Sequence, residues 1–408
     1  MKFWDTGEET NTTTFDYDVM KKKFIENLDY LKEMSVEEQT LYKKWIEWNE
    51  DRVSNMKRLP ALQSYYDSLW KPTDITNKEL TISEIESIDP YVEIVEDDPK
   101  ESTRWTEIRK LIHTMEFSAN PGRNVKIYVK DKTSGKILGQ ICLGSDITSL
   151  GVRDEFIGWS KEDKFEKGKL NCTSIATTIV STQPFGYNFL GGKLIAALAT
   201  APEIRAYWKT KYDNPLVGVG TTSLYGIHSQ YNGIPHFKTL GESKGKISTK
   251  PDDSVYDPWH QWLKENRAEW YKTHIMDERE RNGANMGYEK NGPVSGIKQK
   301  IIQAIFKELG IKGNAYDHGF QRGVYFAQMY QNGNDFLCSK IEEKDLVLNE
   351  KFAKGNEYTI KWWKDKAIKR YTKLHEEGRI KPEVLFYVNA IGMTWEQMKE
   401  HYLKEVGR

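Results

Sequence analysis

The stretch TSIATTIVSTQPFGYNFLGGKLIAALATA, residues 173–201, decides the fold class. Its first ten residues, 173–182, are rich in Ile, Val and Thr, which predicts a buried strand. Residues 183–188 contain Pro and Gly and predict a loop. Residues 189–201 are apolar and small, which predicts a buried helix. A buried strand that leads directly into a buried helix indicates an α/β core.

A hairpin is predicted ahead of this stretch. Val125, Ile127 and Val129 alternate with more polar residues, the segment DKTSG at 131–135 supplies a turn, and residues 137–143 return as a second strand. A further strand is predicted at 216–225. We therefore expect a mixed α/β (α+β) sheet core across residues 101–250.

Two flanking regions differ in charge. Residues 1–100 hold 13 Lys and Arg against 23 Asp and Glu, and apolar residues at spacings of three and four predict helices there; 73–100 read as a linker or a peripheral wrap. Residues 251–408 are predicted to be mainly helical, and 281–408 hold 22 basic against 16 acidic residues. The asymmetry indicates either nucleic-acid contact at one end or pairing of acidic and basic faces inside the molecule.

Several classes of protein are excluded by composition. The sequence has no apolar run of about 18 residues, its first residues lack a secretory pattern, and its three cysteines lie far apart. We expect a soluble protein of a reducing compartment, the cytoplasm of a bacterial or phage-infected cell, without a membrane partner. A composition rich in Lys, Asn, Tyr and Ile indicates an AT-rich genome, which is in keeping with a phage or its bacterial host.

The junction between the loop and the helix at 183–193 is the first candidate site. Backbone N–H groups at a helix start favour an anion, and glycines let a ligand approach closely. The candidate cofactor-binding residues are Gln183, Gly186, Asn188, Gly191, Gly192 and Lys193. Alternatively, the paired glycines let the helix pack tightly on the sheet.

The end of the strand predicted at 216–225 is the second candidate. Ser223, Tyr225 and His228 can orient a substrate or transfer protons, and ligands gather at the carboxyl ends of strands in open α/β sheets. With Asp146 they form the candidate catalytic set. The alternative is a strand end whose hydroxyls are satisfied internally. A site with His228, His236 and Asp146 around iron or zinc is conceivable chemically, but we predict no metal site.

Two segments are candidates for nucleic-acid contact. Arg322, flanked by glycines, offers a planar fork for phosphate or carboxylate, and His318 lies near it in sequence; a packing role for His318 is the alternative. Residues 361–371 interleave cations with aromatics, which suits a phosphate backbone with stacked bases. The candidates there are Lys361, Trp362, Lys364, Lys369 and Arg370. A plain amphipathic helix with buried Trp and solvated Lys explains the same pattern.

A series of short motifs resembles the DruA-like family. The motifs are Leu138-Gly139-Gln-Ile, Phe156-Ile-Gly-Trp159, the 183–193 loop, Thr221-Thr-Ser-Leu-Tyr-Gly226 and Lys238-Thr-Leu-Gly241. The family is named after a component of the Druantia anti-phage defence system and is also encoded by phages. The resemblance implies a DNA-acting protein with DNA and other defence or phage proteins as partners.

The same region is more remotely similar to the Mom family of DNA-modification proteins, which has an acyltransferase-like (GNAT-like) fold. That resemblance implies that the 183–193 loop is a cofactor-binding turn and that Ser223 and Tyr225 lie beside the acceptor. It implies an acyl donor such as acetyl-coenzyme A. The sequence departs from ordinary acetyltransferases because it lacks a clear Arg/Gln-x-x-Gly-x-Gly/Ala turn.

Three functions are therefore in competition. The first is an enzyme that transfers a small acyl or aminoacyl group to an exocyclic amine of a DNA base, which requires the base to leave the stack. The second is a non-catalytic DNA-binding component of a defence or counter-defence system. The third is a nuclease, although no carboxylate arrangement typical of one stands beside a strand.

Overall fold

The computed structural model describes residues 15–95, 98–115, 122–224, 226–227, 229–235, 237–278, 280, 296–382 and 390–405, with side chains throughout except at 246–247, 318–320 and 403–405. The chain divides into two compact units. Unit 1 comprises Met1–Val36 and Ile247–Gly319, and unit 2 comprises Glu37–Lys246 and Phe320–Arg408. Whether the predicted regions 1–100, 101–250 and 251–408 fold independently stays a prediction.

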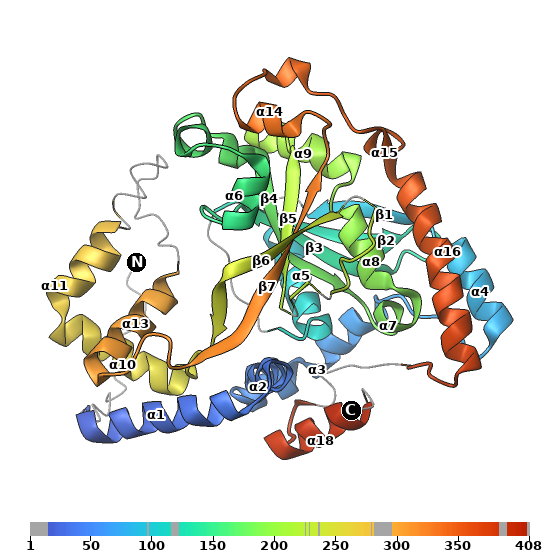
Figure 1. Cartoon of the computed structure of the whole chain (residues 1–408). Coiled ribbons are helices and arrows are strands. Elements are labelled where there is room, and N and C mark those ends of the chain that lie inside the picture. The colour runs from blue at the N-terminus through green and yellow to red at the C-terminus, as the bar shows by residue number, and fades with distance from the viewer. Residues whose placement is uncertain are drawn as a thin grey trace, which may run out of the picture. The chain divides into compact units, whose positions relative to one another are not determined.

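A seven-stranded mixed sheet is the centre of the fold (Figure 1), in the order β1-β2-β3-β4-β5-β7-β6. The strands are β1 (Pro90–Val95), β2 (Asn124–Asp131), β3 (Ile137–Ser145), β4 (Thr173–Ser181), β5 (Gly218–Ser223), β6 (Phe237–Ser248) and β7 (Asp317–Gln328). Neighbours from β1 to β4 are antiparallel, β4 and β5 are parallel, and β5 and β7 are antiparallel. The predicted mixed α+β class is confirmed.

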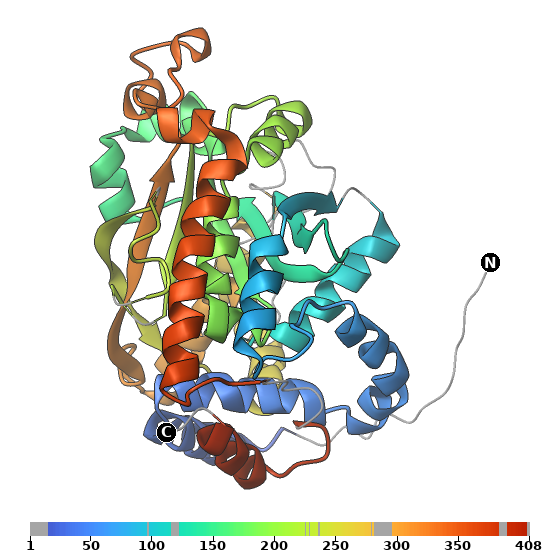
Figure 2. The same ribbon diagram turned by 90° about the vertical axis from the view of Figure 1, so that its right-hand side faces the viewer.

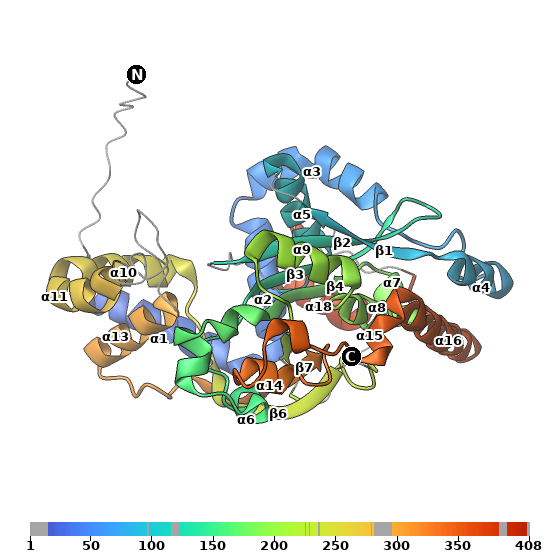
Figure 3. The same ribbon diagram turned by 90° about the horizontal axis from the view of Figure 1, so that it is seen from above.

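Helices cover both faces of this sheet in unit 2. Alternate residues of β3 point to opposite sides: Ile141 joins the core cluster that includes α8 (Gly191–Leu198), whereas the Gln140 amide donates to the carbonyl of Trp105 in α5 (Pro99–Ile112) at 2.9 Å. Figure 3 shows α5 and α8 on the two sides of the strands. The small, apolar residues of α8 let it lie close to β3 and β4.

A second helical layer covers α8. Helix α16 (Gly355–Glu376) packs along α7 (Phe185–Phe189), α8 and α4 (Lys78–Ser87), as Figures 1 and 2 both show. Its buried residues are spaced along one face at Thr359, Trp363, Ala367, Tyr371 and Leu374. The Trp363 indole donates to the Phe189 carbonyl at 2.8 Å, which fixes α16 against the end of α7.

The remaining elements of unit 2 lie around the sheet. They are α2 (Val36–Asn49, whose first residue ends unit 1), α3 (Arg52–Asp67), α6 (Gly151–Ile157), α9 (Pro202–Tyr212), α14 (Gly333–Leu337), α15 (Glu350–Ala353) and α18 (Trp395–Glu405). Among the helices that the structure describes, none combines the length and the apolar character needed to cross a membrane.

Unit 1 has its own aromatic core. It is built from α1 (Tyr17–Glu33), α10 (Asp253–Asn266), α11 (Ala268–Tyr271) and α13 (Ile297–Leu309). Phe24 of α1 is fully buried, and its ring lies 6.2 Å from those of Trp259 and Phe306. Helix α13 buries Ile301, Ile302, Ile305 and Leu309 along one face and ends at Gly310 in a left-handed conformation.

Sequence patterns missed three strands. The prediction of a linker at 73–100 was wrong, because α4 and the edge strand β1 occupy this segment; Pro90 is tolerated as the first residue of a strand at the sheet edge. Strands β6 and β7 were also missed, since glycines such as Gly241, Gly245 and Gly323 interrupt the alternating pattern.

Candidate functional site

The parallel pair β4 and β5 separates toward its carboxyl end. Register pairs join Thr173, Ser174 and Ile175 to residues 218–220, and no pair joins the two strands beyond Ile175. The Thr221 hydroxyl donates to the Ala176 carbonyl at 3.2 Å, just beyond the paired residues. Ligands of open α/β sheets bind at such carboxyl ends, so this opening is the natural place for a site.

The backbones of Ser223 and Arg322 meet at this end of the sheet, but their side chains leave it on opposite faces, because Ser223 pairs with Gly323 and successive residues of a strand alternate faces. Ser223 is the last residue of β5, and its register partner in β7 is Gly323, directly after Arg322. The backbone N–H of Arg322 donates to the Ser243 hydroxyl of β6 at 3.2 Å. A Cβ at Gly323 would collide with the Gly226 backbone, so only glycine fits this position. Two motifs that are about a hundred residues apart in sequence therefore meet at one end of the sheet, with Ser223 and Arg322 on different faces.

The Arg322 guanidinium is a partly buried positive charge at this end of the sheet. This burial lowers its pKa from the ordinary arginine value. Within the described part of the chain, no carboxylate forms an ion pair with it. A partly desolvated guanidinium without a carboxylate partner favours an anionic ligand, since it offers a planar fork of donors.

The predicted cofactor loop is largely used in internal packing. The Gln183 carboxamide accepts from the N–H of Tyr187 at 3.2 Å, and a Cβ at Gly186 would collide with the Ser181 hydroxyl. Asn188 is fully buried; its amide donates to the Pro184 and Lys381 carbonyls at 3.0 and 2.6 Å. Gln183 and Asn188 thus shape α7 and hold the segment after α16.

The start of α8 is likewise occupied by protein groups. A Cβ at Gly191 would collide with the Phe185 ring, and one at Gly192 would collide with the Gln230 side chain. The Lys193 ammonium donates to the carbonyls of Gln230, at 2.9 Å, and Asn232. The two glycines therefore allow close contact of α8 with α7 and with residue 230 rather than with the sheet, and Lys193 holds the segment after β5.

Asp146 lies elsewhere in the sheet. It follows β3, whose last residue, Ser145, pairs with Ser174 at the amino end of β4. Ser174 is level with the start of β5, whereas Ser223 ends β5. The length of β5, about 16 Å at about 3.3 Å per residue, therefore separates Asp146 from Ser223. Its carboxylate forms a buried ion pair with Arg153 at 2.6 Å and accepts from the N–H of Ile147 at 2.7 Å. Asp146 therefore belongs to a packing network and is not adjacent to Ser223.

The Asp146 network also includes groups of opposite charge around α6. Arg153 and Lys164 both pair with Asp154, at 2.6 and 2.7 Å. Burial raises the pKa of Asp146, and Arg153 opposes that effect. Three further predicted residues cannot be located: Tyr225 and His228 lie outside the described residues, and so does the side chain of His318.

The residues predicted on the basic aromatic helix divide between two faces of α16. Lys361 and Lys364 line a cavity of about 370 Å³ whose other walls include Glu86, Asp89, Glu357 and Asp365. Trp362 and Lys369 are seven residues apart and share the opposite face, and the Arg370 guanidinium lies 5.3 Å from the Tyr187 ring. The amphipathic-helix reading is supported, because Trp363 is buried while Lys361 and Lys369 are exposed; nucleic-acid contact by this helix stays a prediction.

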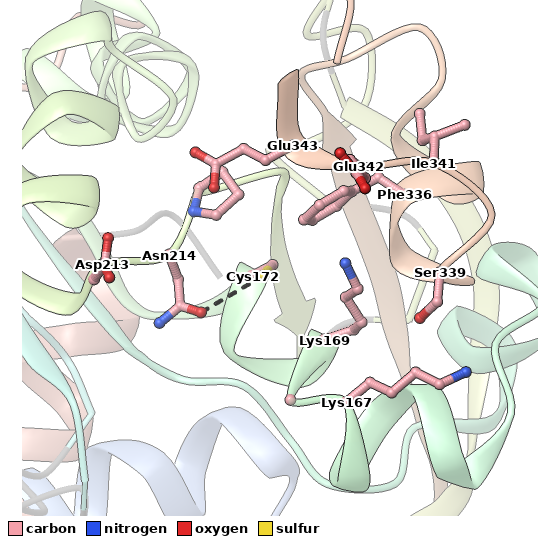
Figure 4. A pocket seen from close by; sticks show the side chains of 12 residues that line it. Lys167, Lys169, Cys172, Asp213, Asn214, Phe336, Ser339, Ile341, Glu342 and Glu343 are labelled. Atoms are coloured by element: carbon pink, nitrogen blue, oxygen red, sulfur yellow. Dashed lines mark hydrogen bonds between the residues drawn. The ribbon is translucent and has the colours of Figure 1, made fainter. Parts of the chain in front are cut away.

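A larger cavity, of about 490 Å³, lies at the amino ends of β4 and β5 (Figure 4). Lys169 extends into it with its ammonium 3.5 Å from the centre of the Phe336 ring. Burial raises the pKa of Cys172 to about 11, so this thiol stays protonated at neutral pH and is a poor nucleophile. The cavity contains none of the residues predicted from the sequence.

No group of three or more His, Cys, Asp or Glu is placed to hold a metal ion among the residues described above. The predicted set of Asp146 with two histidines is not tested by this, since both histidines lie outside them. Beyond the predicted turn, the backbone groups of β4 after Ile175 are free of a partner strand on the β5 side.

Comparison with known proteins gives a consistent identity. The family model of the Druantia protein DruA matches residues 43–339. The Druantia protein DruA of Escherichia coli (strain UMEA 4076-1) is 27% identical over 254 residues, which cover 58% of this chain and 58% of that relative. The chain therefore matches little more than half the length of its curated relative. No solved structure matches. Since the family model covers well over half of the chain, the protein belongs to the Druantia protein DruA family.

Proposed function

We propose that this protein is a DNA-acting component of an anti-phage defence system and that the diverging end of β4 and β5 is its group-transfer site. The reaction is the transfer of a small acyl or aminoacyl group to an exocyclic amine of a DNA base. The amine nitrogen forms a bond to the acyl carbon, the bond from that carbon to its leaving group breaks, and the leaving group takes the proton that the amine loses.

One observation carries the proposal: β4 and β5 pair over three residues and then separate toward the end of β5, where Ser223 lies. Backbone groups of β4 beyond Ile175 have no partner strand on the β5 side, so they can bind an extended donor such as an acyl thioester. Arg322, on the other face of the sheet, would contact a phosphate of the DNA. Ser223, which is buried, would orient the amine.

The order of elements supports the same conclusion. The β2–β3 hairpin precedes β4, helices α7 and α8 follow it, and β5 then ends at Ser223. This is the order that the resemblance to the Mom family implies for an acyltransferase-like fold. The parallel β4–β5 pair lies between antiparallel neighbours, so it is the one point in the described sheet between β3 and β7 at which adjacent strands run in the same direction. Ligands of open α/β sheets bind where the strand arrangement changes in this way.

Mass spectrometry of nucleosides from the DNA of expressing cells tests the proposal. We expect a new nucleoside mass with the wild type, and a loss of at least about tenfold with Ser223→Ala and with Arg322→Gln. Lys132→Gln, an exposed charge change on a distant turn, is the matched control and should behave as the wild type. Ordinary nucleosides alone, from folded wild type expressed during phage infection, would refute group transfer.

A non-catalytic DNA-binding role is the second candidate. It is favoured by the internal use of Lys193 and Asn188, which leaves the predicted cofactor turn without these two polar groups. In this case Ser223→Ala and Arg322→Gln would leave phage resistance unchanged, and wild type would protect cells without any new nucleoside.

A further inference from the structure

Cations gather around one aromatic ring on the surface of unit 2. The Tyr187 ring of α7 lies 5.3 Å from the Arg370 guanidinium and 5.2 Å from the Lys381 ammonium. Arg379 is close enough that Tyr187 contributes to raising its pKa, after the larger effect of its hydrogen bond with Glu377. Three cations, one from α16 and two from the segment that follows it, thus lie around the same ring.

Helix α16 extends this charge along its solvent side. Lys366, Lys369 and Lys373 are exposed and recur at spacings of three and four, so they share one face with Trp362. The Lys366 ammonium lies 5.7 Å from the Trp362 ring. Lys366 is also near Lys193, whose pKa is lowered first by burial and second by this neighbour.

Few carboxylates compensate these cations among the residues that the structure describes. Glu377 pairs with Arg379 at 2.7 Å and with Lys373 at 3.8 Å, and Glu376 pairs with Lys78 at 2.9 Å. The Nε atom of Arg370 is buried without a hydrogen-bond partner. Like charges held together raise the free energy of the unbound protein, and a polyanion would lower it.

We propose that this face, the Tyr187 surface, binds the phosphate backbone of double-stranded DNA. We define the surface as Tyr187, Trp362, Lys366, Lys369, Arg370, Lys373, Arg379 and Lys381. It deepens the proposed function, since it names the surface by which the DNA substrate is held.

The dimensions favour a polymer over a small anion. The α16 part alone, from Lys366 to Lys373, extends about 10 Å at about 1.5 Å per residue. Duplex DNA carries one charge per about 1.7 Å of its axis, so several phosphates face this length. A single small anion would require cations that converge on one point.

The opposite face of α16 is unsuited to the same ligand. The cavity there is lined by the carboxylates of Glu86, Asp89, Glu357 and Asp365 against the ammonium groups of Lys361 and Lys364. The Lys364 ammonium already donates to the Glu86 carbonyl at 2.6 Å. Excess negative charge repels phosphates, so Lys361 and Lys364 are assigned to packing between α16 and the end of α4.

Fluorescence anisotropy with a labelled 24-base-pair duplex, over a range of salt concentrations, tests the proposal. The test variant carries Lys366→Gln, Lys369→Gln and Lys373→Gln. The control variant carries Lys340→Gln, Lys344→Gln and Lys351→Gln, which removes the same charge from exposed lysines outside the Tyr187 surface. We expect the test variant to bind roughly tenfold or more weakly at low salt, with a salt slope shallower by about 2 to 3.

Arg370→Gln, checked for folding by thermal unfolding, should weaken binding by roughly threefold to tenfold. The proposal is overturned if wild type does not bind the duplex, if test and control variants weaken equally, or if the test variant binds like wild type. Stronger binding of single-stranded RNA of the same sequence would also overturn it. Nucleoside analysis separates the two proposals. DNA binding through this surface without a new nucleoside refutes only group transfer. A new nucleoside made by a test variant whose DNA binding is unchanged refutes only the surface.

Discussion

The Lys44 ammonium is an uncommon charge for a protein interior. It is fully buried beside Trp48, and burial lowers its pKa to about 8, although Glu47, 2.7 Å away, opposes the shift. Below pH 8 both the folded and the unfolded chain hold this proton. Between pH 8 and about 10.5 only the unfolded chain keeps it, so the contribution of Lys44 to stability rises with pH in this window.

Lys44→Met should therefore be at least as stable as wild type at pH 7. Its advantage should shrink, by on the order of 3 kcal/mol, as the pH approaches 10.5. Urea unfolding at a series of pH values measures the difference between the two proteins. Lys132→Met, at an exposed position, controls for net charge. A difference that stays constant from pH 7 to 10 would contradict this account.

Asp146 provides a second test at a single position. Asp146→Asn removes a buried charge from the Arg153 guanidinium, which is itself almost fully buried. We expect a loss of about 3–5 kcal/mol in the free energy of unfolding, because the buried Arg153 charge loses its fully buried partner. Among the described residues, only the Asp154 carboxylate then remains paired with Arg153. Chemical denaturation measures the loss. Wild-type stability combined with lost activity would instead make Asp146 a catalytic residue.

Among the elements, α8 lies close to its neighbours because its first residues are glycines. A methyl group at Gly191 would enter the Phe185 ring, which is fully buried and has no free direction to move. Gly191→Ala should destabilise the protein by about 1–3 kcal/mol in urea unfolding. Gly245→Ala meets no atom within 4 Å and is the matched control. Equal stability of the two variants would show that α8 can shift on β3 and β4.

The elements that were predicted correctly share a physical property. The β2–β3 hairpin, β4 and α13 carry an uninterrupted apolar period, so local sequence specifies them. The helix predicted at 189–201 is instead divided, because Leu190 adopts a left-handed conformation between α7 and α8. Strand β7, which carries Arg322, was not predicted, because its own sequence lacks an alternating pattern and its pairing with β5 depends on a distant segment.

For the molecule as a whole, the two units allow a separate test of unit 1. Phe24→Ala should cost about 3–5 kcal/mol, because the ring fills the space between Trp259 and Phe306. Unfolding should then occur in two steps, with protease cleavage of residues 253–309 at lower urea than cleavage within unit 2. Val19→Ala, at an exposed position of α1, is the control. A single transition shared by both units would contradict independent cores.

The sequence by itself determined the mixed α+β class, the hairpin, the buried strand and the chemistry of the candidate residues, because periodicity and side-chain type are local properties. Only the tertiary structure decided which of those residues meet. Pairing of β5 with β7 joins Ser223 to Arg322, packing of residues 230–232 occupies Lys193, and the docking of α16 separates Lys361 from Lys369. These outcomes depend on burial and hydrogen-bond partners supplied by distant segments, which no local pattern encodes.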